Sequence, residues 1–343
     1  MKRNILYSVF LLVASGLAAQ VNMDNVLFEN SPSLCQAGVT NKSPGKALSF
    51  SYAINPDYKM LPPDGEQPTK VRRNERFETR MKIPVVYAPK WKVMLGFDYT
   101  LERYHFLDID PDNYPLFKHL NETDLKNAAV SASIFHPFNH KYYTSFRLSA
   151  NWQGDYSSFL NTDSRYAVYR FTGAFGVKKR DNLEYGAGIL VSKGYRGHSV
   201  VPFGFYNQTF NEHWGIETVL PSSVKVRYNF SEERLLMFGT ELSSQNYALK
   251  VSEPIIQPEN APYHFRRASI DMVGSFYQKL TGWTWVQLKA GYAFDNNSDA
   301  RDVPRRLTHQ LKPSGSVIGS ISFFISPSKQ CLEKVCAQLP IGL

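Results

Sequence analysis

The sequence predicts an all-β protein, a single antiparallel up-and-down transmembrane β-barrel of about 14 strands. Three observations predict this fold. Apolar and polar residues alternate along many segments, which is the period of a strand with two different faces. Aromatic residues make up 14% of the chain, yet its mean hydropathy of −0.33 makes it hydrophilic on average. Short and long connections also alternate, as they do between the two rims of a membrane barrel.

The alternation is clearest over residues 91–103. One face of this segment carries Trp91, Val93, Leu95, Phe97, Tyr99 and Leu101, and the other carries Lys92, Gly96, Asp98, Thr100 and Glu102. Residues 77–85 and 142–152 repeat the pattern. Many segments approach ten residues, the length that a tilted strand needs to cross a bilayer. The other predicted strands are 47–54, 123–135, 166–178, 183–193, 199–209, 213–220, 223–230, 234–250, 263–279, 283–294 and 314–326.

The connections set the strand count. Short turns are predicted at 88–89, 136–140, 179–182, 211–212, 231–233 and 281–282, and longer links at 55–70, 104–122, 153–165, 194–198, 251–262 and 295–313. A connection at 221–222 completes an even number of strands, with both termini in the periplasm. Segment 213–220 is short for a full crossing. If it merges with 223–230 the count falls to 13, which bacterial barrels avoid, so loss of a second weak strand would give 12 strands as the alternative. A soluble sandwich or lipocalin-like barrel would also alternate, but strand length and aromatic content favour the membrane.

The N-terminus predicts export. Residues 1–19 combine Lys2 and Arg3 with a short apolar run and then small residues, as in a secretory signal. The apolar run is about half of the roughly 20 residues that a membrane helix needs. We therefore expect an outer-membrane protein with a signal peptide (1–19), an N-terminal periplasmic segment (20–45), a barrel (46–326) and a periplasmic C-terminal tail (327–343).

The net charge of +9 suggests an anionic partner. An exported protein rarely meets nucleic acid, so outer-membrane lipid and lipopolysaccharide are the expected partners, although solvated loops explain the charge equally well. Cys35, Cys331 and Cys336 lie outside the predicted strands, and two of them could form a disulfide. No histidine accompanies the Cys-x4-Cys spacing, so we predict neither a metal nor a cofactor.

A family resemblance appears over residues 202–230. The residues that carry it are Pro202-Phe203, Tyr206, Phe210-Asn211, Trp214, Leu220-Pro221 and the run Val224 to Phe230. Together they resemble a family of bacterial outer-membrane barrels that is classed only as a domain of unknown function. Residues 77–99 look like that family's first long hairpin, and the resemblance covers 46–250 clearly and 263–326 loosely. It implies a barrel in the outer membrane and brings no catalytic residues, and the cysteine-containing tail departs from it.

Charged residues on the polar faces predict a mixed-charge lumen wall. A tight turn near 88–89 would place Glu78 near Asp98, with arginines diagonally beside them. One interpretation is a wet, ion-selective passage, because rings of charge tune selectivity. The other is a salt-bridged network that fills a closed interior, which the near balance of signs favours. The predicted lumen residues are Arg72, Arg76, Glu78, Arg80, Lys82, Asp98, Glu102 and Arg147.

Five tryptophans are predicted to be membrane-interface aromatics. Trp91, Trp214, Trp283 and Trp285 lie next to predicted short turns, and Trp152 lies toward the other rim. Gly186 and Gly188 lie within an alternating strand, so we expect them to make room for neighbouring side chains rather than to bind a nucleotide.

Three classes of function are compatible with these patterns. The first is a passage or binding barrel for a small solute. The second is a closed barrel that serves an envelope assembly and meets a periplasmic protein partner through its termini. The third is an outer-leaflet lipid-modifying enzyme, for which His198-Ser199 is the one adjacent histidine–serine pair. No G-x-S-x-G motif occurs, and we expect no enzyme.

Overall fold

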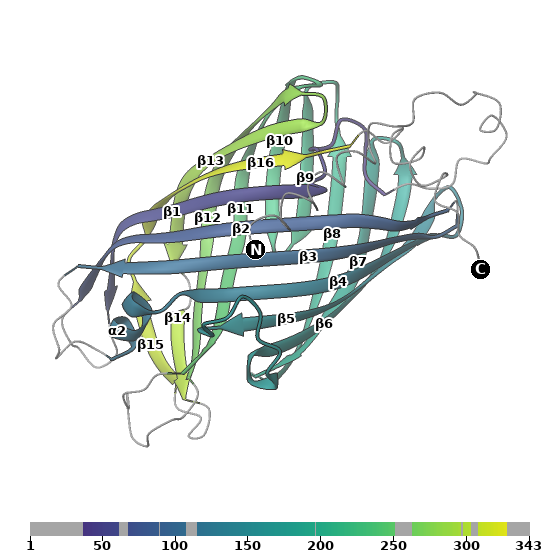
Figure 1. Ribbon diagram of the computed structural model, residues 1–343. Coiled ribbons are helices and arrows are strands. Elements are labelled where there is room, and N and C mark those ends of the chain that lie inside the picture. Colours follow the sequence, from purple (N-terminus) through teal and green to yellow (C-terminus); the bar gives the residue numbers. More distant parts are fainter. Residues whose placement is uncertain are drawn as a thin grey trace, which may run out of the picture. The chain divides into compact units, whose positions relative to one another are not determined.

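The computed structural model describes residues 37–61, 68–88, 90–107, 115–195, 197–250, 263–295, 298–302 and 308–327. They form a closed antiparallel β-barrel (Figure 1). Of the 16 strands, β14 and β15 make a short hairpin, and the other 14 make the barrel wall. The predicted all-β fold and the strand count of 14 are therefore confirmed.

The wall strands follow the chain in order. They are β1 (Leu48–Leu61), β2 (Thr69–Tyr87), β3 (Lys92–Phe106), β4 (Leu125–Pro137), β5 (Tyr142–Gly154), β6 (Ala167–Arg180), β7 (Leu183–Gly194), β8 (Gly197–Thr209), β9 (Trp214–Leu220), β10 (Ser223–Ser231), β11 (Arg234–Leu249), β12 (Tyr263–Thr281), β13 (Thr284–Asp295) and β16 (Ser316–Ile325). The remaining elements are the helix α2 (Pro115–Glu122), the short 3-10 turn η2 (Ser164–Tyr166) and the strands β14 (Ser298–Asp302) and β15 (Thr308–Pro313).

The barrel closes between its first and last strands. β1 pairs with β16 from Leu48 opposite Ile325 to Ile54 opposite Gly319. Closure gives wall strands a backbone partner on both sides, which the hydrocarbon core of a membrane demands. We call the end with the short turns, where β1 begins and β16 ends, the inner rim. The opposite end is the outer rim.

Two connections at the outer rim differ from the prediction. The link predicted at 194–198 is only two residues long, because β7 runs to Gly194 and β8 starts at Gly197. The link predicted at 295–313 contains the β14–β15 hairpin, which pairs with β12 on one side and β1 on the other. The sequences of β14 (SDARD) and β15 (THQLKP) contain almost no apolar residues, so they display no alternation that could reveal a strand.

The wall extends least far from the inner rim at β9 and β10, because these strands have only 7 and 9 residues. β8 pairs with β9 only from Gly204 to Thr209, and β11 pairs with β10 only up to Glu241. Above this point the sheet is joined again where Ala248 of β11 lies beside Gly154 of β5. The segment that looked short in the sequence is thus a separate strand, and the wall is shorter around it.

The two faces of the wall differ as a membrane barrel requires. Large apolar side chains point outward and are exposed, among them Phe50, Phe77, Leu95, Leu148 and Leu288. Their strand neighbours are mostly polar or small and point inward. A soluble β-barrel would bury its apolar faces inside, so this orientation excludes the soluble alternative. No helix in the described residues is long and apolar enough to span a membrane.

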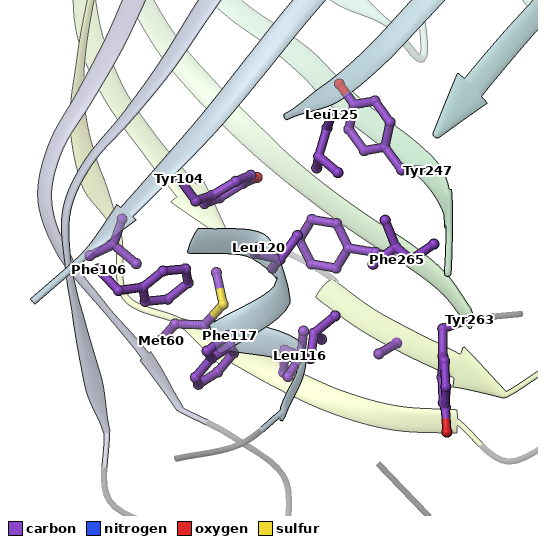
Figure 2. Packing of buried hydrophobic residues seen from close by; sticks show 14 of the residues in the cluster. Met60, Tyr104, Phe106, Leu116, Phe117, Leu120, Leu125, Tyr247, Tyr263 and Phe265 are labelled. Carbon is purple, nitrogen blue, oxygen red and sulfur yellow. The ribbon is translucent and has the colours of Figure 1, made fainter. Parts of the chain in front are cut away.

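The main apolar core lies inside the barrel at the outer rim. The helix α2 enters the lumen there and buries Leu116, Phe117 and Leu120 completely (Figure 2). Pro115 suits its first turn, where a missing N–H costs nothing. Asn121 accepts a hydrogen bond of 2.9 Å from the Phe106 backbone N–H. The outer cluster, as we call this core, comprises Tyr58, Met60, Val71, Tyr104, Phe106, Leu116, Phe117, Leu120, Leu125, Tyr247, Leu249, Tyr263, Phe265, Ala300 and Leu311.

Candidate functional site

The predicted lumen charges of β2 and β3 lie side by side. Arg76 is opposite Glu102 and Arg80 is opposite Asp98. The prediction that Glu78 would face Asp98 is wrong by two residues, because Glu78 faces Thr100. The hairpin turn is longer than predicted and the register shifts between Pro84 and Val86.

Ion pairs join several of these charges. Glu78 pairs with Arg80, and Arg147 of β5 donates to Asp98 at 3.3 Å and to the Ser131 hydroxyl at 3.2 Å. Glu102 is completely buried. It accepts hydrogen bonds from Asn74 at 2.9 Å and from the Tyr247 hydroxyl at 2.7 Å.

The prediction for Arg72 is corrected. A bulge lies between Val71 and Arg73 in the pairing of β2 with β3, so Val71 and Asn74 are both buried in the interior. Arg72 falls within the bulge and is exposed, because the alternation of faces does not continue through an extra residue.

The opposite wall carries charges that we did not single out from the sequence. Glu241 of β11 lies between Lys225 of β10, at 2.6 Å, and Lys289 of β13. Closer to the inner rim, completely buried Arg227 pairs with Glu217 at 2.6 Å and donates to Thr209 at 2.8 Å. The period-two argument that found the charges of β2 would have found these too.

Residues 37–47, which we call the mouth segment, cross the inner end of the lumen. At one side, Ala47 donates its backbone N–H to Ile325 at the end of β16. At the other side, Thr40 donates to Asp181 in the turn between β6 and β7, and Gly38 donates to Glu184. This part of the expected periplasmic segment is therefore held inside the barrel mouth.

Polar side chains of the barrel wall hold the mouth segment in place. Ser43 donates its N–H and its hydroxyl to Glu217, at 2.9 and 2.7 Å. Lys46 donates to Gln287 of β13 at 2.6 Å. Glu217 therefore serves the wall, through Arg227, and the mouth segment at once.

Between the mouth segment and the outer cluster, the lumen retains accessible polar side chains. The side chains of Arg80 and Arg147 are 54% and 41% exposed, although both point inward. Space for water must therefore surround them. The middle of the lumen thus holds accessible charged side chains, whereas its two ends are closed by the outer cluster and by the mouth segment.

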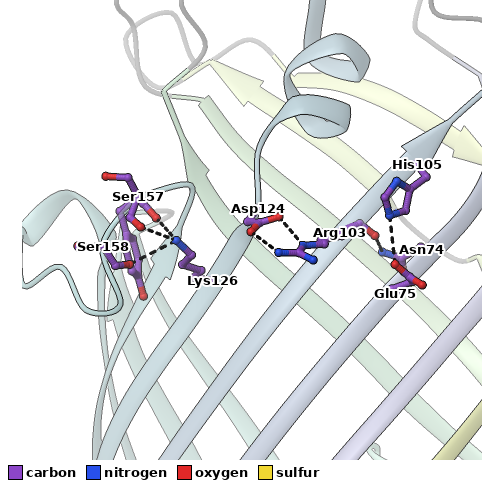
Figure 3. A network of polar contacts seen from close by, with 9 residues as sticks. Asn74, Glu75, Arg103, His105, Asp124, Lys126, Ser157 and Ser158 are labelled. Carbon is purple, nitrogen blue, oxygen red and sulfur yellow. Dashed lines mark hydrogen bonds and ion pairs between the residues drawn. The ribbon is translucent and has the colours of Figure 1, made fainter. Parts of the chain in front are cut away.

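A polar network lies along one stretch of the outer rim, from β2 to the connection after β5 (Figure 3). Arg103 donates to Asp124 at 2.7 and 2.9 Å, and these bonds hold the pKa of the Asp124 carboxyl below its usual value. Lys126 donates to the carbonyls of Tyr156 and Ser157 at 2.9 and 2.8 Å. The network fastens the connections after β3 and β5 to the wall.

Four of the five tryptophans that we predicted to be interface aromatics lie near the two ends of the wall. Trp91, Trp214 and Trp283 are exposed beside short turns, and Trp152 packs under the loop at the outer rim. The prediction for Trp285 is corrected, because this ring is 7% exposed and packs inside the barrel against Phe324. Trp283 belongs to the turn, and the inward face of β13 begins at Trp285.

Glycines of β7 make room for aromatic rings, as predicted. A Cβ atom at Gly188 would lie 2.5 Å from the Phe203 ring, and one at Gly186 would lie 2.4 Å from the Phe205 ring. Both rings belong to β8 and lie against the inner face of the wall.

The histidine–serine pair does not form a site. His198 lies opposite Lys193 on the outward face, whereas Ser199 points inward and shares a hydrogen bond of 2.9 Å with Ser192. In the described residues, no group of three histidine, cysteine, aspartate or glutamate side chains could hold a metal ion. Residues 1–36, with the predicted signal and Cys35, lie outside the described residues, as does the tail from 328 with Cys331 and Cys336.

Solved structures with a similar fold are distant in sequence. A mutant of the TodX monoaromatic hydrocarbon channel shares 8% identity over 83% of this chain and 91% of its own, with a TM-score of 0.40. A FadL homologue of Pseudomonas aeruginosa shares 9% over 81% and 89%, with a TM-score of 0.40. The toluene transporter TbuX of Ralstonia pickettii shares 9% over 83% and 90%, with a TM-score of 0.30. Likenesses of this size carry no argument about function.

Sequence comparison gives the family. No curated protein matches this sequence. A family described as a domain of unknown function, DUF6268, matches residues 72–302, which covers β3 to β13, most of β2 and the lumen charges of both walls. This span is more than half of the 343 residues. The chain therefore belongs to the DUF6268 family of domains of unknown function.

Proposed function

We propose that this chain is a gated passage for a small solute in the outer membrane. The observation that carries the proposal is the accessible polar middle of the lumen, where Arg80 and Arg147 point inward and yet stay 54% and 41% exposed. A barrel with a purely structural role has no need of unfilled, charged space, since buried charge is costly unless it is paired and hydrogen-bonded.

The two ends of the lumen differ in a way that suits two separate gates. The outer closure is apolar and depends on one short helix, α2, whose Leu116, Phe117 and Leu120 fill the lumen. The inner closure is polar and depends on a chain segment held by Glu184, Glu217 and Gln287. Either closure could move without unpairing the strands of the wall.

Single-channel recording in a planar bilayer tests the proposal. We expect the unaltered barrel to be mostly silent, because both ends are closed. A variant that lacks residues 37–45 and carries serine at Leu116, Phe117 and Leu120 should give steady, salt-dependent current steps. Phe159→Ser with Leu160→Ser is the matched control, because these side chains are exposed at the same rim. If the folded protein with both closures removed gave no current steps, the proposal would be overturned.

The second candidate is a closed barrel that serves as a structural or interaction component of the envelope. The closure of both ends favours it. This candidate predicts that the double variant stays silent, and that a periplasmic partner co-purifies with the full chain and is lost when the chain is truncated after Ile325. We propose no catalytic role, since His198 and Ser199 point to opposite faces of the wall.

The proposed orientation can be tested on whole cells. Ser158 lies in the connection between β5 and β6 at the outer rim, and Asn139 lies in the short turn between β4 and β5. In an otherwise cysteine-free chain, we expect Ser158→Cys to react with a membrane-impermeant maleimide on intact cells and Asn139→Cys to react only after lysis. The reverse pattern would mean that the barrel is inserted the other way round.

A further inference from the structure

One row of inward-facing residues crosses seven strands of the wall. Pairing places Lys82 of β2 opposite Gly96, Gly96 opposite Ser131, and Ser131 opposite Ser149. The row then continues through Arg170 of β6 to the serines of β7 and β8. We call it the serine row, and its members are Lys82, Gly96, Ser131, Ser149, Arg170, Ser192 and Ser199.

The two cations of the serine row differ from five other cations that point into the lumen. Arg80, Arg147, Lys225, Arg227 and Lys289 each have a carboxylate partner. Within the part of the chain that the structure describes, Lys82 and Arg170 have no carboxylate within 4 Å. The one hydrogen bond of the Arg170 side chain goes to the Asn151 amide oxygen, at 3.0 Å. A cation that lines a confined lumen without a carboxylate beside it attracts a mobile anion.

The hydroxyls between these cations retain hydrogen-bond donors. Ser131 accepts from Arg147 at 3.2 Å, and Ser149 accepts from Asn151 at 3.2 Å. A serine oxygen that accepts such a bond still has its own O–H to donate. Gly96 leaves room for the Ser131 hydroxyl, because a Cβ atom at position 96 would lie 2.5 Å from the Ser131 hydroxyl oxygen.

We propose that the serine row binds the anionic group of the solute, a carboxylate or a phosphate, on its way through the lumen. This inference rests on the proposed passage function and names the class of solute. Hydroxyl donors flanked by a lysine and an arginine match the oxygens of either group, and hydrogen bonds to an ionised acceptor are the stronger kind. Lysine and arginine also line pores that select anions.

Wall geometry allows the two cations to act together. Lys82 and Arg170 are four strand spacings apart, which is about 19 Å along the curved wall. Both side chains are long. Arg147 lies two residues from Ser149 on β5 and also points inward, so three cations border the space above Ser131 and Ser149. An anion above Ser131 and Ser149 would meet donors from the wall and positive charge on both flanks.

Nuclear magnetic resonance of weakly bound anions tests the inference on the full-length folded barrel in micelles. The probes are inorganic phosphate, followed through its ³¹P line width, and ¹³C-acetate, each titrated at constant ionic strength. We expect saturable broadening of at least one probe. Arg170→Gln and Lys82→Gln should each weaken the affinity at least fivefold, and Ser149→Ala should weaken it less. The probe that saturates identifies the group as phosphate or carboxylate.

Lys225→Gln is the matched control, because it removes the same charge from the opposite wall. A barrel of 14 strands is roughly 25 Å wide, whereas salt screens charges beyond about 10 Å at 0.1 M. The affinity of the Lys225→Gln variant for the probes should therefore stay within twofold of that of the unaltered protein. Heat-dependent gel mobility confirms that each variant is folded, and Arg170→Lys should retain most of the binding.

Two results would overturn the inference. One is the absence of saturable binding of either probe both to the folded barrel and to the folded variant whose two closures have been removed. The other is an equal loss of affinity in Lys225→Gln and Arg170→Gln, which would mean diffuse attraction by the whole lumen. Neither result depends on conductance, so a barrel that conducts and binds no anion refutes only the serine row. A barrel that binds and never conducts refutes only the passage.

Discussion

Glu217→Gln should lower the free energy of unfolding by about 3–5 kcal/mol, the usual cost of leaving a buried charge without its partner. Its partner Arg227 is completely buried and lies 2.6 Å from the Glu217 carboxylate. Urea unfolding in lipid, followed by tryptophan fluorescence, measures the change. Glu233→Gln is the control, because its pair with Lys279 is largely exposed at a turn. Such exposed pairs contribute about 0–1 kcal/mol.

A double variant separates the two roles of Glu217. Adding Arg227→Met to Glu217→Gln removes both charges, and with them the penalty of leaving one buried charge without its partner. We expect at least half of the lost stability to return. Ser43 would still lose one of its two carboxylate acceptors, because glutamine offers a single side-chain oxygen. Trypsin should therefore cleave after Lys42 faster in both variants than in the unaltered barrel. A Glu217→Gln protein within about 1 kcal/mol of the unaltered one would contradict the assigned burial.

The strands could be predicted from the sequence because most of them show the alternation of apolar and polar residues within their own segment. Phe77, Met81 and Ile83 alternate with Glu78, Arg80 and Lys82, and the membrane requires the apolar set to face outward. The lumen charges of β2 followed from the same alternation. Their pairing did not, because one bulge and a longer turn shifted the partner of Arg80 to Asp98. Period-two patterns determine faces and leave register to turn geometry.

The closures of the lumen could not be predicted, because their evidence is not local. α2 is eight residues long, and the groups that bury it come from β1, β2, β3, β4, β11, β12, β14 and β15. Gly38 and Ser43 meet carboxylates that lie 146 and 174 positions away in the chain. Trp285 likewise looked like an interface aromatic beside a turn, and only the start of β13 at Thr284 sends it inward.

Phe117→Ala should open the outer closure without unfolding the wall. Phe117 is completely buried and its ring stacks on Phe106 with centroids 5.2 Å apart. Truncation of a buried phenylalanine costs about 3–5 kcal/mol, through lost burial and the cavity that remains. The cost falls on α2, because strand pairing does not involve this helix. It is held by this packing, by the Phe106–Asn121 hydrogen bond and by the His119–Asp155 pair.

Hydrogen exchange of the α2 amides measures this local cost, since such amides exchange through local opening. A loss of about 3–5 kcal/mol corresponds to exchange that is roughly 10² to 4 × 10³ times faster, at 1.4 kcal/mol for each factor of ten. Amides of β11 and β12 below the outer cluster should keep their protection. Phe159→Ala, at a side chain that is 61% exposed on the same rim, should leave α2 unchanged. Equal acceleration in α2 and in the wall strands would mean that the helix is part of the barrel's cooperative core, and the outer closure would then be no gate.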